Sequence, residues 1–247
     1  ANIELPTAAG SVTVSTAPHP ARAAPGASPL NPLSSHPSTS DRAPAAAPTS
    51  FDDLGVADVL ASGLRAAGIR EPFPIQALAI PDALAGRDVC GKARTGSGKT
   101  LAFGLPVIQR TAKAAPGKPG ALILVPTREL AVQVAEVLAP LAKRDGKAVE
   151  AFYGGVSIGK QIQALRQGTD IVIATPGRLI DLVQRGAASL AEVRIVVLDE
   201  ADRMCDMGFL PQVERILGFL RHREQTMLFS ATLDGAVDVI VKAYLRD

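Results

Sequence analysis

The sequence has few cysteines and no long hydrophobic run, and each shortage argues against a class of protein. Cys90 and Cys205 lie far apart, with no second cysteine or histidine at ligand spacing, which argues against a zinc site and a structural disulfide. Aliphatic runs such as residues 195–198 are far shorter than the ~18 residues of a membrane span, and no basic and then apolar leader opens the chain. We therefore predict a soluble, cytoplasmic protein.

The chain also lacks a strong charge of either sign. Its 26 lysines and arginines face 24 aspartates and glutamates, which leaves a net charge of +2. A strongly basic balance would indicate a nucleic-acid partner through charge alone, and that indication is missing here. Any surface that binds nucleic acid must therefore be local.

Residues 1–50 have little from which to build a core. They contain nine of the 19 prolines, are otherwise mostly alanine, serine and threonine, and carry few charges. Such a composition buries too little apolar area to offset roughly 1–2 kcal/mol of backbone entropy per residue. We predict a disordered low-complexity tail over residues 1–50 and one globular domain over residues 51–247. The start at Ala1 is what a fragment would show.

After Phe51, short apolar runs alternate with longer segments of helical period, which is typical of an α/β domain with a parallel sheet flanked by helices on both faces. The predicted strands are residues 88–93, 121–125, 148–153, 170–174, 194–198 and 226–229. The predicted helices include residues 100–110, 128–143, 159–167, 179–185, 211–220 and 237–245. Ligands of such sheets bind beyond the carboxyl ends of the strands, so the residues that follow each strand form the candidate site.

The segment ARTGSGKT leaves the first of these strands and enters a helix. Its two glycines allow a tight turn whose backbone N–H groups can surround phosphate oxygens. Lys99 would then contact the β and γ phosphates, and Thr100 would offer its hydroxyl to Mg²⁺. An ordinary glycine-rich turn is the alternative, because such a match arises by chance in roughly one chain of this length in fifty. The predicted contacts to the nucleotide in this loop are Thr95, Gly96, Ser97, Gly98, Lys99 and Thr100.

The sequence DEAD follows the strand at residues 194–198 directly. Asp199 is placed to hold Mg²⁺ through its water shell, and Glu200 to orient and deprotonate the water that attacks the γ phosphate. A run of acids at a solvated helix start is the alternative, but it does not explain why an aliphatic strand delivers them to the sheet edge. The candidate catalytic residues are Lys99, Asp199 and Glu200, and the candidate metal ligands are Thr100 and Asp199.

Two further strand ends carry the sequences PTR and TPGR. Threonine suits a helix N-cap and proline the first helical position, so hydroxyls, N–H groups and guanidinium groups would point outward together. Such a surface binds the phosphate backbone rather than the bases, and a GG pair would let a sugar-phosphate chain lie close to the main chain. Plain helix capping is the alternative. The candidate residues of this phosphate-backbone surface are Pro126, Thr127, Arg128, Gly154, Gly155, Thr175, Pro176, Gly177 and Arg178.

From Phe51 to its end the chain resembles the DEAD-box family of ATP-dependent RNA helicases. GIREPFPIQ, with Phe51 placed 17 residues ahead of it, resembles the Q motif of the family, and ARTGSGKT, PTRELA, GG, TPGR, DEADRM and SAT follow in the family order. The resemblance implies the N-terminal RecA-like P-loop domain of the motor. It also implies ATP and Mg²⁺ as cofactors. It assigns the PTR, GG and TPGR residues to contacts with the backbone of RNA, a partner bound with little sequence specificity.

The resemblance also gives roles to residues whose chemistry alone is ambiguous. It implies that Gln76 hydrogen-bonds the adenine edge while Phe51 stacks on the base, although Phe51 could simply anchor the fold and Gln76 could cap a helix. Two residues depart from the family pattern. Phe73 stands where threonine is usual between the two prolines of the Q motif, and Arg94 stands where glutamine is common in the phosphate loop.

A last set of roles concerns coupling between sites and between domains. The resemblance implies that Asp202, Ser230 and Thr232 link the acidic residues to the RNA side. It also implies a second, similar domain that gives arginines to the γ phosphate, and no HRxGRxGR-like motif occurs in this chain. Such an arginine is worth roughly 10³–10⁵ in rate, so we expect this monomeric chain alone to be nearly inactive. A non-catalytic RNA- or protein-binding module, or a P-loop kinase with a lid and an acceptor pocket, are the other hypotheses.

Overall fold

The computed structural model describes residues 2–7, 10–16, 50–94 and 96–246. Every predicted strand and helix has a counterpart whose ends differ by no more than three residues. The strands are β1 (Asn2–Thr7), β2 (Gly10–Thr16), β3 (Val89–Lys92), β4 (Ala121–Leu124), β5 (Val149–Phe152), β6 (Ile171–Ala174), β7 (Ile195–Asp199) and β8 (Gln225–Ser230). The helices are α1 (Asp58–Ala66), α2 (Pro74–Leu84), α3 (Lys99–Arg110), α4 (Arg128–Arg144), α5 (Ile158–Gly168), α6 (Pro176–Gln184), α7 (Ala201–Asp206), α8 (Leu210–Phe219) and α9 (Ala236–Tyr244).

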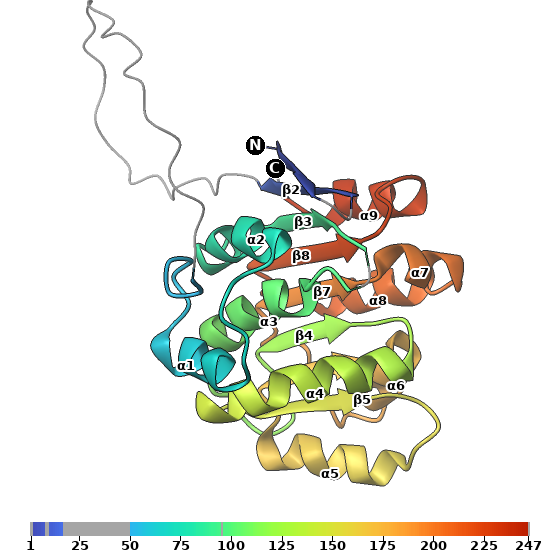
Figure 1. Ribbon diagram of the computed structural model, residues 1–247. Coiled ribbons are helices and arrows are strands. Elements are labelled where there is room, and N and C mark those ends of the chain that lie inside the picture. Colours follow the sequence, from blue (N-terminus) through green and yellow to red (C-terminus); the bar gives the residue numbers. More distant parts are fainter. Residues whose placement is uncertain (1, 8–9, 17–49, 95, 247) are drawn as a thin grey trace, which may run out of the picture.

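The strands form one sheet in the order β1-β2-β3-β8-β7-β4-β6-β5, and the six strands from β3 to β5 in this order are parallel (Figure 1). Every residue of the central strands β4, β6, β7 and β8 is buried, as aliphatic runs covered on both faces should be. The predicted α/β class with a parallel sheet is thus confirmed.

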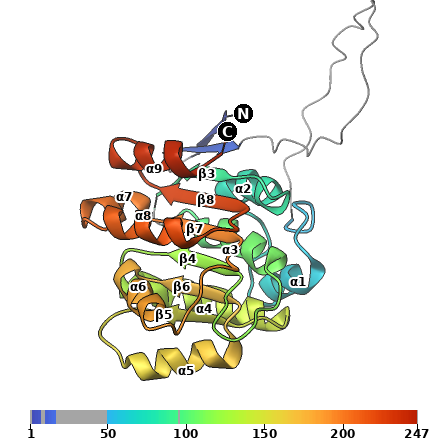
Figure 2. The ribbon, with the colours of Figure 1, turned by 180° about the vertical axis from the view of Figure 1, so that it is seen from behind.

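Helices cover both faces of the sheet, so two hydrophobic clusters form. Helices α1 to α4 pack on one face (Figure 1). The cluster on this face includes Ile123 and Val197. Helices α5 to α9 supply the cluster on the opposite face, which receives Leu122 and Leu198 (Figure 2). Adjacent strand residues point to opposite faces, so each central strand contributes to both clusters.

The N-terminal segment differs from the predicted tail. Instead of disorder throughout residues 1–50, the structure has β1 and β2 as an antiparallel pair, and β2 pairs antiparallel with β3, with Thr16 opposite Val89. The β-branched valines and threonines in residues 10–16 favour a strand, and the edge of β3 offers unpaired backbone groups to it. Residues 17–49 lie outside the described residues, so their disorder and the domain limits stay predictions.

Three helices were not predicted from the strand-helix pattern, namely α1, α2 and α7. Helix α2 begins at Pro74, which suits the first helical position, and ends with Ala85 as its C-cap residue. It contacts α3 and so carries the Q-motif segment beside the phosphate loop. No helix within the described part of the chain is long and apolar enough to cross a membrane.

Candidate active site

The sequence motifs that follow the strands meet at one edge of the sheet. The parallel register sets Lys92 beside Ser230, and Asp199 beside Phe229. On the other side of β7, Leu124 pairs with both Leu198 and Ala174. The carboxyl ends of five neighbouring strands are therefore level, and the phosphate loop, the DEAD residues and the PTR, TPGR and SAT segments leave the sheet together.

The phosphate loop has the backbone that its glycines allow. Gly96 and Gly98 have φ values of 82° and 84°, in the left-handed region that side chains disfavour, and α3 begins at Lys99 immediately afterwards. Among the described residues, no hydrogen-bond partner exists for the buried Ser97 Oγ. A buried hydroxyl without a partner at a helix N-terminus fits a site for an anion. Thr95 lies outside the described residues.

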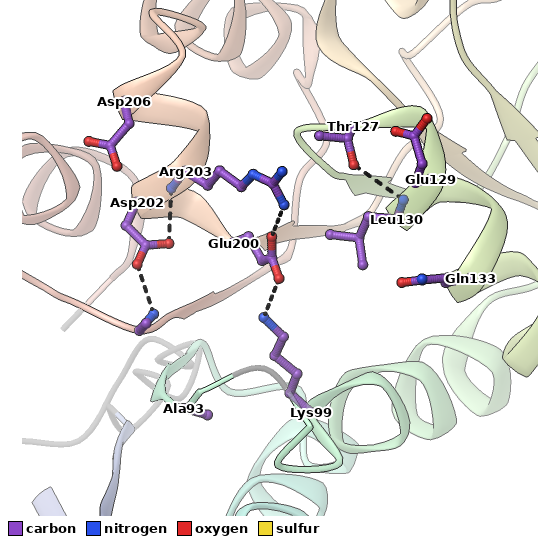
Figure 3. Close-up of a pocket in the computed structure, with 11 residues that line it drawn as sticks. Ala93, Lys99, Thr127, Glu129, Leu130, Gln133, Glu200, Asp202, Arg203 and Asp206 are labelled. Atoms are coloured by element: carbon purple, nitrogen blue, oxygen red, sulfur yellow. Dashed lines mark hydrogen bonds and ion pairs between the residues drawn. The ribbon is translucent and has the colours of Figure 1, made fainter.

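Lys99 joins the phosphate loop to the DEAD residues (Figure 3). Its Nζ atom lies 3.0 Å from Asp199 Oδ1 and 3.5 Å from Glu200 Oε1. The Lys99 and Asp199 side chains are 7% and 0% exposed. The three predicted catalytic side chains therefore form one buried charge cluster, although 100 residues separate Lys99 from Asp199 in the sequence.

Asp199 is the most deeply buried acid of this cluster. Burial raises the pKa of its carboxyl, and Lys99 partly opposes this change. Its Oδ1 atom accepts a hydrogen bond of 2.9 Å from the Glu200 N–H, whereas its buried Oδ2 atom has no hydrogen-bond partner within the described chain. A desolvated carboxylate oxygen without a donor fits a hydrated divalent cation, for which oxygen ligands are preferred.

Glu200 is held in an unusual backbone conformation. Its φ is 52°, and among the described residues every other positive φ belongs to a glycine. Left-handed backbone costs a residue with a Cβ roughly 1–2 kcal/mol. Arg203, one turn along α7, donates from Nη1 to Glu200 Oε2 at 3.3 Å. The carboxylate is thus held from both sides, by Lys99 and by Arg203. Such local strain is often found at functional sites.

Arg203 is a site residue that the motif analysis did not select. The spacing from Glu200 to Arg203 is the i, i+3 spacing of a helical ion pair, and this would have been the signal in the sequence. Both residues border a cavity of about 610 Å³ (Figure 3). The cavity is lined by Ala93, Lys99, Thr127, Glu129, Leu130, Gln133, Glu200, Asp202, Arg203, Asp206 and Ala231.

The predicted coupling residues lie in direct contact. The Asp202 N–H donates to Ser230 Oγ at 3.1 Å. In return, Asp202 Oδ2 accepts from the N–H groups of Ala231 and Thr232 at 3.1 and 3.2 Å. Three hydrogen bonds therefore tie the DEAD and SAT segments to each other. The Thr232 contact is made by its main chain, whereas Ser230 contributes its hydroxyl.

The PTR and GG segments lie side by side. Thr127 caps α4 by accepting from the Leu130 N–H at 3.3 Å, as a capping threonine should. A Cβ atom added to Gly155 would lie 3.5 Å from Arg128 Nη1, so the guanidinium group lies over this glycine. Gly154, Gly155 and Arg128 are exposed, whereas Pro126 is buried. Pro126 therefore shapes the surface without offering its side chain.

The TPGR segment joins the same edge through Arg178. Its Nη1 atom donates to Gln161 Oε1 at 2.7 Å and to the Val156 carbonyl at 3.3 Å. Gly177 is exposed and Thr175 is half-buried, while Pro176 is buried at the first position of α6. Arg178 thus fastens the segment after β5 to α6.

The residues predicted to hold adenine are turned inward. Gln76 is 1% exposed, and its amide links two segments. Its Oε1 atom accepts from the Phe73 N–H at 2.8 Å, and its Nε2 atom donates to the Gly98 carbonyl at 2.8 Å. Phe51 is 2% exposed and packs in the core, as the anchoring alternative requires. Their roles toward a base stay predictions.

Comparison with known proteins points to one family. A family model described as DEAD/DEAH box helicase matches residues 73–239. The chain is 46% identical over 200 residues to the ATP-dependent RNA helicase DeaD of Escherichia coli, which covers 81% of this chain and 32% of that protein. It is 45% identical over 200 residues to the mitochondrial DEAD-box ATP-dependent RNA helicase 9 of Arabidopsis thaliana, with 79% and 32% covered.

Solved structures agree with this result. The fold matches a DEAD box protein from Methanococcus jannaschii with a TM-score of 0.74 and 37% identity, over 80% of this chain and 54% of that one. It matches the RNA helicase Prp28 from Chaetomium thermophilum, solved bound to ADP, with a TM-score of 0.73 and 42% identity, over 80% and 48% of the two chains. The chain spans about a third of the length of the curated relatives that it matches.

Proposed function

Because the chain belongs to the DEAD/DEAH box helicase family, we propose that it is the nucleotide-binding RecA-like domain of an ATP-dependent RNA helicase. The observation that carries this proposal is the buried cluster in which Lys99 lies 3.0 Å from Asp199 and 3.5 Å from Glu200. In the proposed reaction, Lys99 leaves these acids to bind the β and γ phosphates. Glu200 then accepts a proton from the water that attacks the γ phosphorus, while the bond from this phosphorus to the bridging oxygen breaks and ADP leaves.

We propose Mg²⁺ as the second cofactor. Asp199, whose buried Oδ2 atom lacks a hydrogen-bond partner among the described residues, would hold the hydrated ion together with the Thr100 hydroxyl. The ion would neutralise charge on the phosphates. The protein's own part is to keep Asp199 desolvated and to fix its Oδ1 atom by the Glu200 N–H, so that Oδ2 is the oxygen that stays available.

We propose that the exposed surface formed by the PTR, GG and TPGR segments binds the backbone of RNA. Arg128 and the glycines beside it are exposed at the same sheet edge as the phosphate loop, and no base-reading side chain is required for phosphate contacts. The Asp202 hydrogen bonds to the SAT segment would carry the state of the nucleotide site to this surface. Local unwinding would need a second RecA-like domain as partner. Action as a monomer and a cytoplasmic location are also predictions.

The central experiment measures ATP hydrolysis with and without RNA, on this chain alone and after it is joined to a second domain of the family. We expect slow hydrolysis by the chain alone and RNA stimulation in the joined form. Glu200→Gln should lower kcat by at least a hundredfold while ATP binding persists. Asp206→Asn, at an exposed residue that lines the same cavity, should leave kcat unchanged. The proposal fails if RNA does not stimulate the joined form, or if Lys99→Ala hydrolyses ATP as the parent does.

RNA binding has its own test in the salt dependence of the dissociation constant. Arg128→Ala should weaken binding about equally for all sequences and lower the slope of log K against log salt by about 1. Arg185→Ala is the matched control, because this arginine pairs with Asp181 at 2.7 Å on the exposed side of α6. Equal slopes for both variants would mean that Arg128 does not contact the RNA backbone.

A further inference from the structure

Phe73 exposes an aromatic ring beside the phosphate loop. Phe73 is 57% exposed. The other large hydrophobic residues exposed in the described chain are aliphatic or methionine. Single exposed apolar residues are normal on protein surfaces, so exposure alone indicates nothing. The position of this ring next to the proposed nucleotide site is what indicates a role.

The ring lies against the main chain of the loop. A Cβ atom added to Gly98 would come within 2.5 Å of Phe73 Cδ2 and 2.6 Å of Gln76 Nε2. An added Cβ on Gly96 would meet nothing within 4 Å. The phenyl ring therefore flanks the loop at Gly98 and leaves the side at Gly96 open for phosphates.

The Gln76 amide ties the main chain that carries this ring to the phosphate loop. It accepts from the Phe73 N–H and donates to the Gly98 carbonyl, both at 2.8 Å, so the Phe73 main chain is tied to the loop. Phe73 is not among the residues that line the 610 Å³ cavity, which contains Lys99 and Glu200. The phosphate end of a nucleotide would lie in the cavity, and a base joined to it through the ribose would project past the loop.

We propose that Phe73 supplies the aromatic face on which the base of the bound nucleoside triphosphate stacks. This inference rests on the proposed nucleotide binding and deepens it. Phe51 is 2% exposed and Gln76 is 1% exposed, so Phe73 is the side chain of the three that the surface presents to a base. Every nucleobase has a π-face, so stacking gives affinity without distinguishing one purine from another. Phe73 thus raises the affinity for ATP and GTP alike.

The first test uses a property of the sequence, which contains no tryptophan. Phe73→Trp places a single indole beside the loop in the full chain. We expect ATP with Mg²⁺ to quench its fluorescence, and inorganic tripolyphosphate, which carries no base, to leave it unchanged. Val239→Trp on α9, at a residue that is 53% exposed, is the matched control and should respond to neither.

The second test measures affinity by calorimetry. Phe73→Ala should weaken the binding of ATP and GTP by the same factor, on the order of tenfold, and leave the affinity for tripolyphosphate unchanged. An equal loss for tripolyphosphate would mean that the ring supports the loop and not the base, which overturns the inference. So would an unchanged ATP affinity, or quenching of the Phe73→Trp variant by an RNA oligonucleotide and not by ATP. If the parent chain binds no ATP at all, the proposed function and this inference fall together.

Discussion

Replacing Lys99 with methionine tests whether the buried charge cluster has the energetics that its geometry implies. Methionine keeps most of the volume of the lysine side chain and removes its charge. The substitution leaves Asp199, which is fully buried, without its counter-charge 3.0 Å away. The free energy of unfolding of the nucleotide-free protein should therefore fall, and the loss should be large because the Asp199 side chain is 0% exposed.

The magnitude follows from the distances. At an effective dielectric constant near 20, two unit charges 3.0 Å apart attract by about 5.5 kcal/mol. Removing one partner of a buried ion pair costs about 3–5 kcal/mol, because the remaining charge stays desolvated. We expect Lys99→Met to lower the free energy of unfolding by about 3–5 kcal/mol at pH 8. With Asp199→Asn added, the loss should be clearly smaller than the sum of the two single changes.

The loss should also depend on pH. Burial raises the pKa of Asp199 in the folded protein, and removal of Lys99 raises it further. A carboxyl whose pKa is higher in the folded than in the unfolded state, about 3.9, binds more protons when folded. Its contribution to stability is fully present below about pH 3.9 and is lost as the pH rises through the folded pKa. The deficit of Lys99→Met should therefore be greatest near pH 8 and shrink toward acid pH.

Urea denaturation followed by circular dichroism measures these differences without a tryptophan signal. Lys242→Met is the matched control, because Lys242 pairs with Asp238 at 2.6 Å on an exposed helix face and such pairs contribute about 0.3–0.5 kcal/mol. Equal urea midpoints for the two variants, or a Lys99→Met deficit that does not change with pH, would refute the reasoning.

Other residues give independent predictions. Asp170→Asn should cost about 2–4 kcal/mol by urea denaturation. Burial tends to raise the pKa of Asp170, yet hydrogen bonds from Lys113 and two backbone N–H groups lower it overall. This stabilisation is therefore present above about pH 3.9 and lost as the pH falls. If the stability of the variant fell toward acid pH as steeply as that of the parent, the prediction would be contradicted. Gly98→Ala forces a Cβ into left-handed backbone and against Phe73, so ATP affinity measured by calorimetry should fall at least tenfold. Burial raises the pKa of Cys90 to about 11, so a thiol reagent at pH 8 should modify it only after urea unfolds the chain. Because Cys205 is only half-buried, peptide mapping must locate the label, and fast labelling of Cys90 in the native protein would disprove its burial.

Local chemistry in the sequence predicted much of the fold and the centre of the site. Short apolar runs predicted the central strands β4, β6, β7 and β8, because a parallel strand buried on both faces is largely apolar. The phosphate loop and the DEAD residues were predicted from the side chains that phosphate and Mg²⁺ require. The N-terminal strands escaped prediction, because β2 forms on the open edge of β3 and its own composition contains little apolar surface.

The sequence by itself determined which chemical groups are present and which strand end carries each of them, because turns, helix caps and strands depend mainly on residues that are neighbours in the chain. Tertiary structure alone decided which groups meet. It brought Lys99 to Asp199 through the parallel register of β3, β8 and β7, and it placed Arg203 on Glu200. It also turned Phe51 into the core and left Phe73 exposed, since the direction of a side chain depends on what packs around it and not on the motif that contains it.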